Sequence, residues 1–128
     1  MTSCNRNICD ESNLTSTFYK KNNALITQDS FVLKTVALKN LSFTHSNGWT
    51  EDYKSFTSSG ESKNLFYNAI TIDSLRTIIT DKTGLIKGVG DFDVLYQNNP
   101  VKLKLSFTET YVCINKEWKL FARHSSKL

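Results

Sequence analysis

The sequence predicts an α+β fold in which a curved antiparallel sheet packs on helices from the N-terminal part of the chain. Three observations lead to this class. Apolar residues recur at helical spacing in the first part of the chain, the chain beyond residue 63 alternates as strands do, and the later segments are joined by short turns. With 128 residues, 39% of them hydrophobic and 12% aromatic, the chain can build one core. We expect a polar lead-in at residues 1–9 and a single domain at residues 10–128.

Helices are predicted at three places in the N-terminal half. Residues 10–27 carry one apolar face and one face rich in lysine and asparagine. Asp29 can cap a second helix over residues 30–39, because its carboxylate can accept hydrogen bonds from the first free amides. A third, short helix is expected to open after Thr50 and to stop at Gly60.

Strands account for the rest of the domain. Residues 41–46 alternate between apolar and polar, and Asn47-Gly48 is a strong turn signal. A change of phase in the first long strand suggests a bulge near Asp73 and Ser74. The short turns imply antiparallel neighbours. The long strands are expected at residues 66–80, 84–97, 100–114 and 117–126.

The strand at residues 100–114 carries the sharpest anomaly. Its odd positions are apolar apart from Glu109, and the early even positions are polar. If the flanking turns have two residues each, Glu109 faces Ala122 on one side and Gly88 on the other. The same count places His124 opposite Phe107 and on the apolar face. It also puts Trp118 and Leu120 on this face, with Gly90 opposite Phe107, Asp93 opposite Lys104, and Arg123 on the outer face.

Charge and cysteine content narrow the function classes. The net charge of +4 is spread along the chain, so no basic stripe indicates nucleic-acid binding. Cys4, Cys9 and Cys113 are odd in number, and a reducing compartment is the default expectation. No zinc ligand set accompanies them, and we expect no metal. No apolar run resembles a signal or a membrane span, so a cytoplasmic protein is expected.

An ordered set of motifs carries a family resemblance. Asp29 precedes a short helix, residues 41–48 form a strand and turn, residues 108–112 lie in the penultimate strand, and residues 118–126 end the chain. From about residue 10 onward this set is similar to the nuclear transport factor 2-like superfamily, which includes ketosteroid isomerase and SnoaL-like polyketide cyclases. Small bacterial stand-alone members match it most closely. The last hairpin lacks the usual glycine, however, and Trp49 stands where smaller residues are common.

The resemblance implies a cone-shaped, cystatin-like α+β barrel with a pocket between sheet and helices. It also implies a homodimer formed through the outer sheet face. In the isomerase branch, a carboxylic acid on the penultimate strand helps to hold a substrate oxyanion, and Glu109 falls at about that place. The isomerase's other acid and its tyrosine find no match here, so its reaction is not carried over.

Glu109 and His124 form the candidate catalytic pair. A carboxylate on an apolar face is costly unless it is paired, and a diagonal histidine would lie within reach. Such a pair could exchange protons near neutral pH without any cofactor. Glycines on the adjacent strand would leave space before the carboxylate. The expected ligand-binding residues around that space are Tyr111, Trp118, Phe92, Phe107, Tyr96 and His45.

Two function classes remain open at this stage. The first is a protein that binds a small apolar or carbonyl compound, with acid/base chemistry of the isomerase, cyclase or lyase type. The second is a non-catalytic dimeric module whose cavity is filled by side chains, in which Glu109 and His124 form only a structural hydrogen bond. The sequence does not decide whether the protein is an enzyme.

Overall fold

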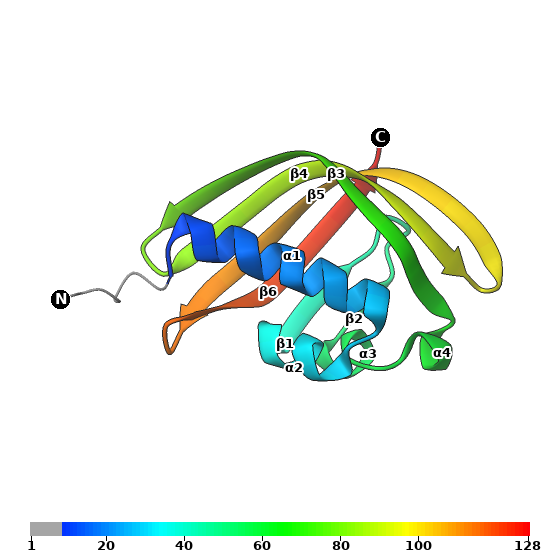
Figure 1. The fold of residues 1–128 in the computed structure, drawn as a ribbon, viewed down its shortest axis with the longest axis horizontal. Coiled ribbons are helices and arrows are strands. Elements are labelled where there is room, and N and C mark those ends of the chain that lie inside the picture. Colours follow the sequence, from blue (N-terminus) through cyan, green and yellow to red (C-terminus); the bar gives the residue numbers. More distant parts are fainter. Residues whose placement is uncertain (1–8) are drawn as a thin grey trace.

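Six strands form one strongly curved sheet in the order β2-β1-β6-β5-β4-β3, and the long helix α1 lies across its concave side (Figure 1). The structure is a computed structural model and describes residues 9–128, so the predicted lead-in lies almost wholly outside it. The helices are α1 (Glu11–Thr27), α2 (Ser30–Val36), α3 (Tyr53–Phe56) and α4 (Gly60–Lys63). The strands are β1 (Ala37–Thr44), β2 (Thr50–Glu51), β3 (Leu65–Thr80), β4 (Thr83–Tyr96), β5 (Asn99–Ile114) and β6 (Glu117–Lys127). The α+β class predicted from the sequence is confirmed.

Side-chain caps set where the first two helices begin. The carboxylate of Asp10 accepts a hydrogen bond from the backbone of Asn13 at 2.8 Å, and Asp29 does the same for Val32 at 3.1 Å. The second helix ends three residues earlier than predicted, because Ala37 already pairs with β6. Gly60 begins α4 and does not end a helix, which corrects the expectation of a stop there.

The four long strands are antiparallel neighbours, as predicted, and β1 adds to the sheet by pairing in parallel with β6. The predicted bulge is confirmed by a shift of register between Ile72 and Ser74. A second shift, between Tyr67 and Ala69, was not expected. Bulges of this kind bend the strand and help the sheet to curve around α1.

The register between β4 and β5 differs from the prediction by two residues. Gln97 and Asn98 form the turn with positive φ at both positions, and Tyr96 pairs with Asn99. The predicted turn lay one residue later. Consequently Ile86, and not Gly88, faces Glu109, so no glycine leaves space there. Gly88 faces Phe107, Asp91 faces Lys104, and Asp93 faces Lys102.

A bulge in β6 overturns the predicted face of its second half. Tyr111 pairs with Leu120, but Thr110 pairs with Ala122, so Phe121 is the extra residue. Trp118 and Leu120 point inward as predicted. Beyond Phe121 the alternation changes phase. Arg123 is therefore buried on the inner face, opposite Glu109, while His124 pairs with Thr108 and is exposed.

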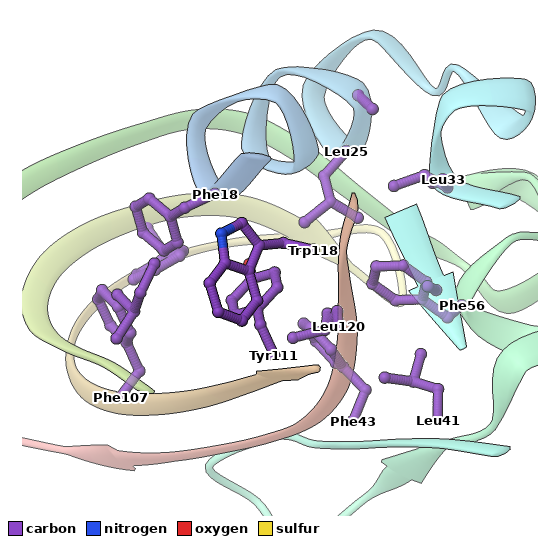
Figure 2. Close-up of a cluster of buried hydrophobic side chains, with 14 of the residues drawn as sticks. Phe18, Leu25, Leu33, Leu41, Phe43, Phe56, Phe107, Tyr111, Trp118 and Leu120 are labelled. Atoms are coloured by element: carbon purple, nitrogen blue, oxygen red, sulfur yellow. The ribbon is translucent and has the colours of Figure 1, made fainter. Parts of the chain in front are cut away.

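The core fills the space between α1 and the sheet (Figure 2). Phe18 of α1 stacks on Phe107 of β5 with ring centroids 5.6 Å apart. At the other end of the core, Phe43 of β1 packs on Phe56 of α3 at 4.8 Å. Tyr111 is fully buried between these two clusters. Apolar burial on this scale is the main force that holds the helices to the sheet.

Cys9 and Cys113 form a disulfide, which the expectation of a reducing compartment did not anticipate. The bond ties the residue before the cap of α1 to the end of β5, across 104 positions of sequence. Nearby, the indole of Trp118 donates to the backbone oxygen of Asp10 at 3.0 Å. The N-terminal end of α1 is therefore fixed to the sheet twice. Cys4 lies outside the described residues.

Candidate functional site

Glu109 lies at the centre of a buried charge cluster beneath α1. The carboxylate is fully buried and accepts hydrogen bonds from Nζ of Lys21 at 2.6 Å and from the hydroxyl of Tyr111 at 2.6 Å. Its Oε2 also lies 3.2 Å from Nε of Arg123. Three different elements, α1, β5 and β6, thus supply partners to one carboxylate. Such pairing is what allows an ionised group to stay in an apolar core.

The environment perturbs the ionisable partners of Glu109. The pKa of Lys21 is lowered to about 8: burial is the main cause and the Arg123 charge adds to it, while the charge and hydrogen bond of Glu109 act in the opposite direction. Burial and the nearby Glu109 charge raise the pKa of Tyr111 well above its usual value. Tyr111 is therefore a neutral donor at physiological pH.

The predicted pair of Glu109 and His124 does not form. His124 is exposed on the outer face because of the bulge at Phe121, and Arg123 takes the inner position. Glu109 is also absent from the lining of the four main pockets in the described part of the chain. The proton-exchange geometry expected from the sequence is therefore absent from the described residues.

A pocket of about 160 Å³ opens at the wide end of the cone, away from Glu109. It was expected between sheet and helices, but strand residues and the β1–β2 turn enclose it, and no helix contributes. Figure 1 shows this end, where the β4–β5 hairpin reaches over the β1–β2 turn. The lining residues are His45, Ser46, Asn47, Trp49, Leu65, Tyr67, Phe92, Val94, Tyr96, Val101, Leu103, Leu105, Arg123 and Lys127.

Arg123 connects the pocket to the charge cluster. Its guanidinium carbon lies 4.8 Å from the ring centroid of Phe43, 5.3 Å from Phe92 and 5.6 Å from Phe107. Three aromatic faces therefore surround the cation, and each can attract it. The residue is only 5% exposed, and its Nε makes no hydrogen bond within the described part of the chain. Its ion pair with Glu109 is close but lies outside hydrogen-bonding geometry.

His45 belongs to a second polar group at the rim of the pocket. Its Nε2 lies 2.6 Å from Oε2 of the buried Glu51, which also accepts from Ser55 at 2.8 Å and from Lys63 at 2.7 Å. Burial acts against ionisation of Glu51. The hydrogen bonds from His45, Lys63 and Ser55, together with the Lys63 charge, outweigh it and lower the pKa of the carboxyl. Glu51 is thus an ionised partner that orients the imidazole.

Aromatic rings stack along the same rim. The His45 ring lies on that of Trp49 with centroids 4.8 Å apart, and Trp49 faces Tyr96 at 6.2 Å. Tyr67 contributes a phenol to the lining, and burial raises its pKa above the usual value. The rim therefore combines flat apolar surfaces with neutral hydroxyl and imidazole groups.

The predicted ligand-binding residues divide into two groups. His45, Phe92 and Tyr96 line the pocket, whereas Tyr111, Phe107 and Trp118 belong to the core below α1. Arg123, Tyr67 and Glu51 were not predicted from the sequence as site residues. Trp49 stood out in the sequence only as a departure from the family pattern. The position of Arg123 depends on one bulge, which no local signal indicated.

Neither a metal cluster nor a membrane-spanning helix is found in residues 9–128. No group of three or more His, Cys, Asp or Glu in this part of the chain is placed to hold a metal ion. None of the described helices is both long and apolar enough to cross a bilayer.

Comparisons with known proteins identify the fold. No protein-family model and no curated protein matches the chain. Solved structures do match it over nearly the whole length. One is a candidate Ca/calmodulin-dependent kinase II association domain from Exiguobacterium sibiricum, with 12% identity, a TM-score of 0.84, and coverage of 100% of this chain and 98% of that one. The architecture is therefore a widely shared one.

Other similar structures carry the superfamily's own name. A nuclear transport factor 2-like protein from Cytophaga hutchinsonii has 14% identity and a TM-score of 0.82, covering 98% of this chain and all of that one. Another, from Rhodospirillum rubrum, has 16% identity and a TM-score of 0.82, covering 90% and 98%. The chain has the nuclear transport factor 2-like fold, as the motifs suggested. Identities this low establish the fold and leave the activity to be argued from the site.

Proposed function

We propose that the protein binds a small molecule in the pocket at the open end of the cone. The observation that carries this proposal is the lining itself: side chains from four strands and one turn surround a cavity, with aromatic rings from β3, β4 and the turn and a buried guanidinium at its inner end. Concave, mostly apolar surfaces with few polar groups are typical of ligand sites. We expect no organic cofactor or metal to be needed for this binding.

A small panel of aromatic probes tests the proposal. Benzoate, benzamide, benzylamine and indole would be titrated into the protein and followed by ligand-observed NMR. Val101 lies half-buried on the pocket wall, and Val112 is half-buried on the outer face of the same strand. Val101→Trp should block binding by filling the cavity, and Val112→Trp should leave it unchanged. Absence of binding by every probe, or binding insensitive to Val101→Trp, would refute the proposal.

Acid/base chemistry is a second candidate, and its carrier is His45. The 2.6 Å contact with an ionised, buried Glu51 is the arrangement that orients a general base, and His45 faces the pocket. One solved structure of this fold, from Streptomyces avermitilis, is described as a candidate dehydratase, with 14% identity and a TM-score of 0.74. If His45 is the general base, Glu109 contributes to the reaction only indirectly, by holding Arg123 in place.

Enolisation of a carbonyl probe separates catalysis from simple binding. Phenylpyruvate exchanges its benzylic protons with deuterated water when a base removes them. The protein should accelerate this exchange, and His45→Gln should remove the acceleration while benzoate binding persists. Exchange at the uncatalysed rate with the wild-type protein would exclude this role and leave the binding proposal intact.

The outer sheet face supports the proposed homodimer. Phe121 and Ile114 are 38% and 40% exposed there, on neighbouring strands, and together they offer apolar surface to a partner. The Exiguobacterium sibiricum protein is described as an association domain. Light scattering should show a dimer that Phe121→Glu converts to a monomer, and a monomeric wild-type protein would contradict it.

A further inference from the structure

We propose that the ligand of the pocket is an anion, a carboxylate on a flat apolar body whose charge lies against Arg123. This inference rests on the proposed function and names the chemical class of the ligand. Its basis is an imbalance of charge in the interior, where two buried cations share one carboxylate.

The buried cluster contains more positive than negative charge. Lys21 is 2% exposed and Arg123 is 5% exposed, and both share the single carboxylate of Glu109. Tyr67 and Tyr111 are neutral, because burial raises the pKa of each. Two cations against one anion leave a net charge of +1 beneath α1. An uncompensated buried charge is costly. An anion that binds beside the cluster would therefore supply the negative charge that balances it.

The pocket is the route by which an anion reaches this charge. Its lining includes Arg123 at the inner end and Lys127 at the mouth, and none of its lining residues is an aspartate or glutamate. The nearest carboxylate on the rim side, that of Glu51, is already paired with Lys63 at 2.7 Å. An entering anion therefore meets attraction at both ends of the cavity and no opposing fixed charge from its lining.

Unused hydrogen-bond donors lie on the same strand face. Nε of Arg123 and the hydroxyl of Ser125 are buried and make no hydrogen bond within residues 9–128, although Nε lies 3.2 Å from the Glu109 carboxylate. Arg123, Ser125 and Lys127 alternate along the inner face of β6. Buried polar groups are almost always satisfied, and a group that is not calls for an explanation. A carboxylate in the pocket would accept from the arginine, whose fork matches its geometry.

The walls define the rest of the ligand. Phe92, Trp49 and Tyr96 present ring faces, and the cavity of about 160 Å³ suits a single ring with a short substituent. Benzoate is the smallest aromatic compound that has both proposed features, a carboxylate and a flat apolar ring. Benzamide keeps its shape without the charge, and benzylamine reverses the charge.

Isothermal titration with these three probes tests the inference. Benzoate should bind at least tenfold more tightly than benzamide, and benzylamine should bind most weakly. Arg123→Gln should abolish the preference for benzoate, whereas Lys102→Gln, which removes one exposed cation from the outer face, should preserve it. Arg123→Gln can fail to fold. In that case the preference for benzoate over benzamide in the wild-type protein, with Val101→Trp as the blocked control, is sufficient to test the inference.

The remaining outcomes are distinct from one another. Equal binding of benzoate and benzamide, or preference for benzylamine, would overturn the anionic ligand and leave the pocket as a binding site. A preference for benzoate that survives in Val101→Trp would also overturn it, because the anion would then bind elsewhere. Failure of all three probes to bind would refute the proposed binding function as well.

Discussion

Glu109 has the role of a structural and positioning residue at the scale of single side chains. Its carboxylate holds Lys21 of α1, Tyr111 of β5 and Arg123 of β6 at one point. The contact with Arg123 fixes the guanidinium where the pocket ends. We therefore propose that the residue predicted as an acid catalyst from the sequence acts through its neighbours.

Replacing Glu109 should destabilise the protein strongly. Glu109→Gln leaves two cations buried without a countercharge, and we expect a loss of about 3–5 kcal/mol in the free energy of unfolding. The double variant Lys21→Met/Glu109→Gln removes one of those cations and should recover part of the loss. Urea denaturation measures both. A loss below about 1 kcal/mol for Glu109→Gln would show that the cluster does not carry this energy.

Lys21 should give the protein an unusual dependence on alkaline pH. Its pKa is about 8 in the folded protein, against 10.5 for an ordinary lysine. Between these values the unfolded chain binds more protons, so stability must rise with pH across this window. Relative to Lys21→Met, the wild-type protein should gain up to ~3 kcal/mol from pH 7.5 to 10.5. Parallel stability curves for the two proteins would contradict the lowered pKa.

Part of this site could be read from the sequence. The parity of β5 predicted that Glu109 is buried, and the alternation of residues 41–46 placed His45 on the inner face. Arg123 could not be found in this way, since a single extra residue in a strand reverses every later side chain. The partnership with Lys21 was equally hidden, because a lysine on a helix is normally solvated.

At the scale of elements, the hairpins and bulges decide the register. The turns at Gln97-Asn98 and Asn115-Lys116 use positive φ in residues other than glycine. The long helix and the four long strands followed from periodicity and caps, whereas α2 is shorter than predicted and β2 and α4 were not predicted. The register failed at β4–β5 because two adjacent polar dipeptides could each form the turn, and nothing local separated them.

Lys116→Gly should stabilise the last hairpin. Lys116 has a φ of 66°, a conformation that costs a residue with a side chain but suits glycine. We expect a gain of about 1 kcal/mol in unfolding free energy. Lys116→Ala keeps the Cβ and should give no gain, which separates backbone strain from loss of the charge. Equal effects of the two substitutions would argue against strain at this turn.

At the scale of the whole molecule, the disulfide and the curved sheet hold a single core. We propose that residues 10–128 unfold as one unit, because α1 packs along the sheet and its N-terminal end is tied to β5. The cysteine count alone could not predict this bond, since the pairing depends on where α1 begins relative to the end of β5. A disulfide is also more typical of an oxidising compartment than of the cytoplasm that the sequence suggested.

Reduction should lower the stability of the whole domain. Cross-linking residues about 100 positions apart restricts the unfolded chain, and loss of the link should cost about 4 kcal/mol. Thermal unfolding with and without reductant measures this effect. The variant Cys9→Ser/Cys113→Ser should have the same stability as the reduced protein, and reductant should not change it. If mass spectrometry of the oxidised protein finds both thiols free, the disulfide between Cys9 and Cys113 does not form.

The most direct measurement is a crystal structure of the protein grown with benzoate. Arg123 should lie on the inner face of β6, in contact with Glu109 on one side and with the benzoate carboxylate on the other. His124 should point to solvent. Density showing His124 inside and Arg123 outside, or benzoate bound with its carboxylate turned away from Arg123, would contradict the role proposed for Arg123.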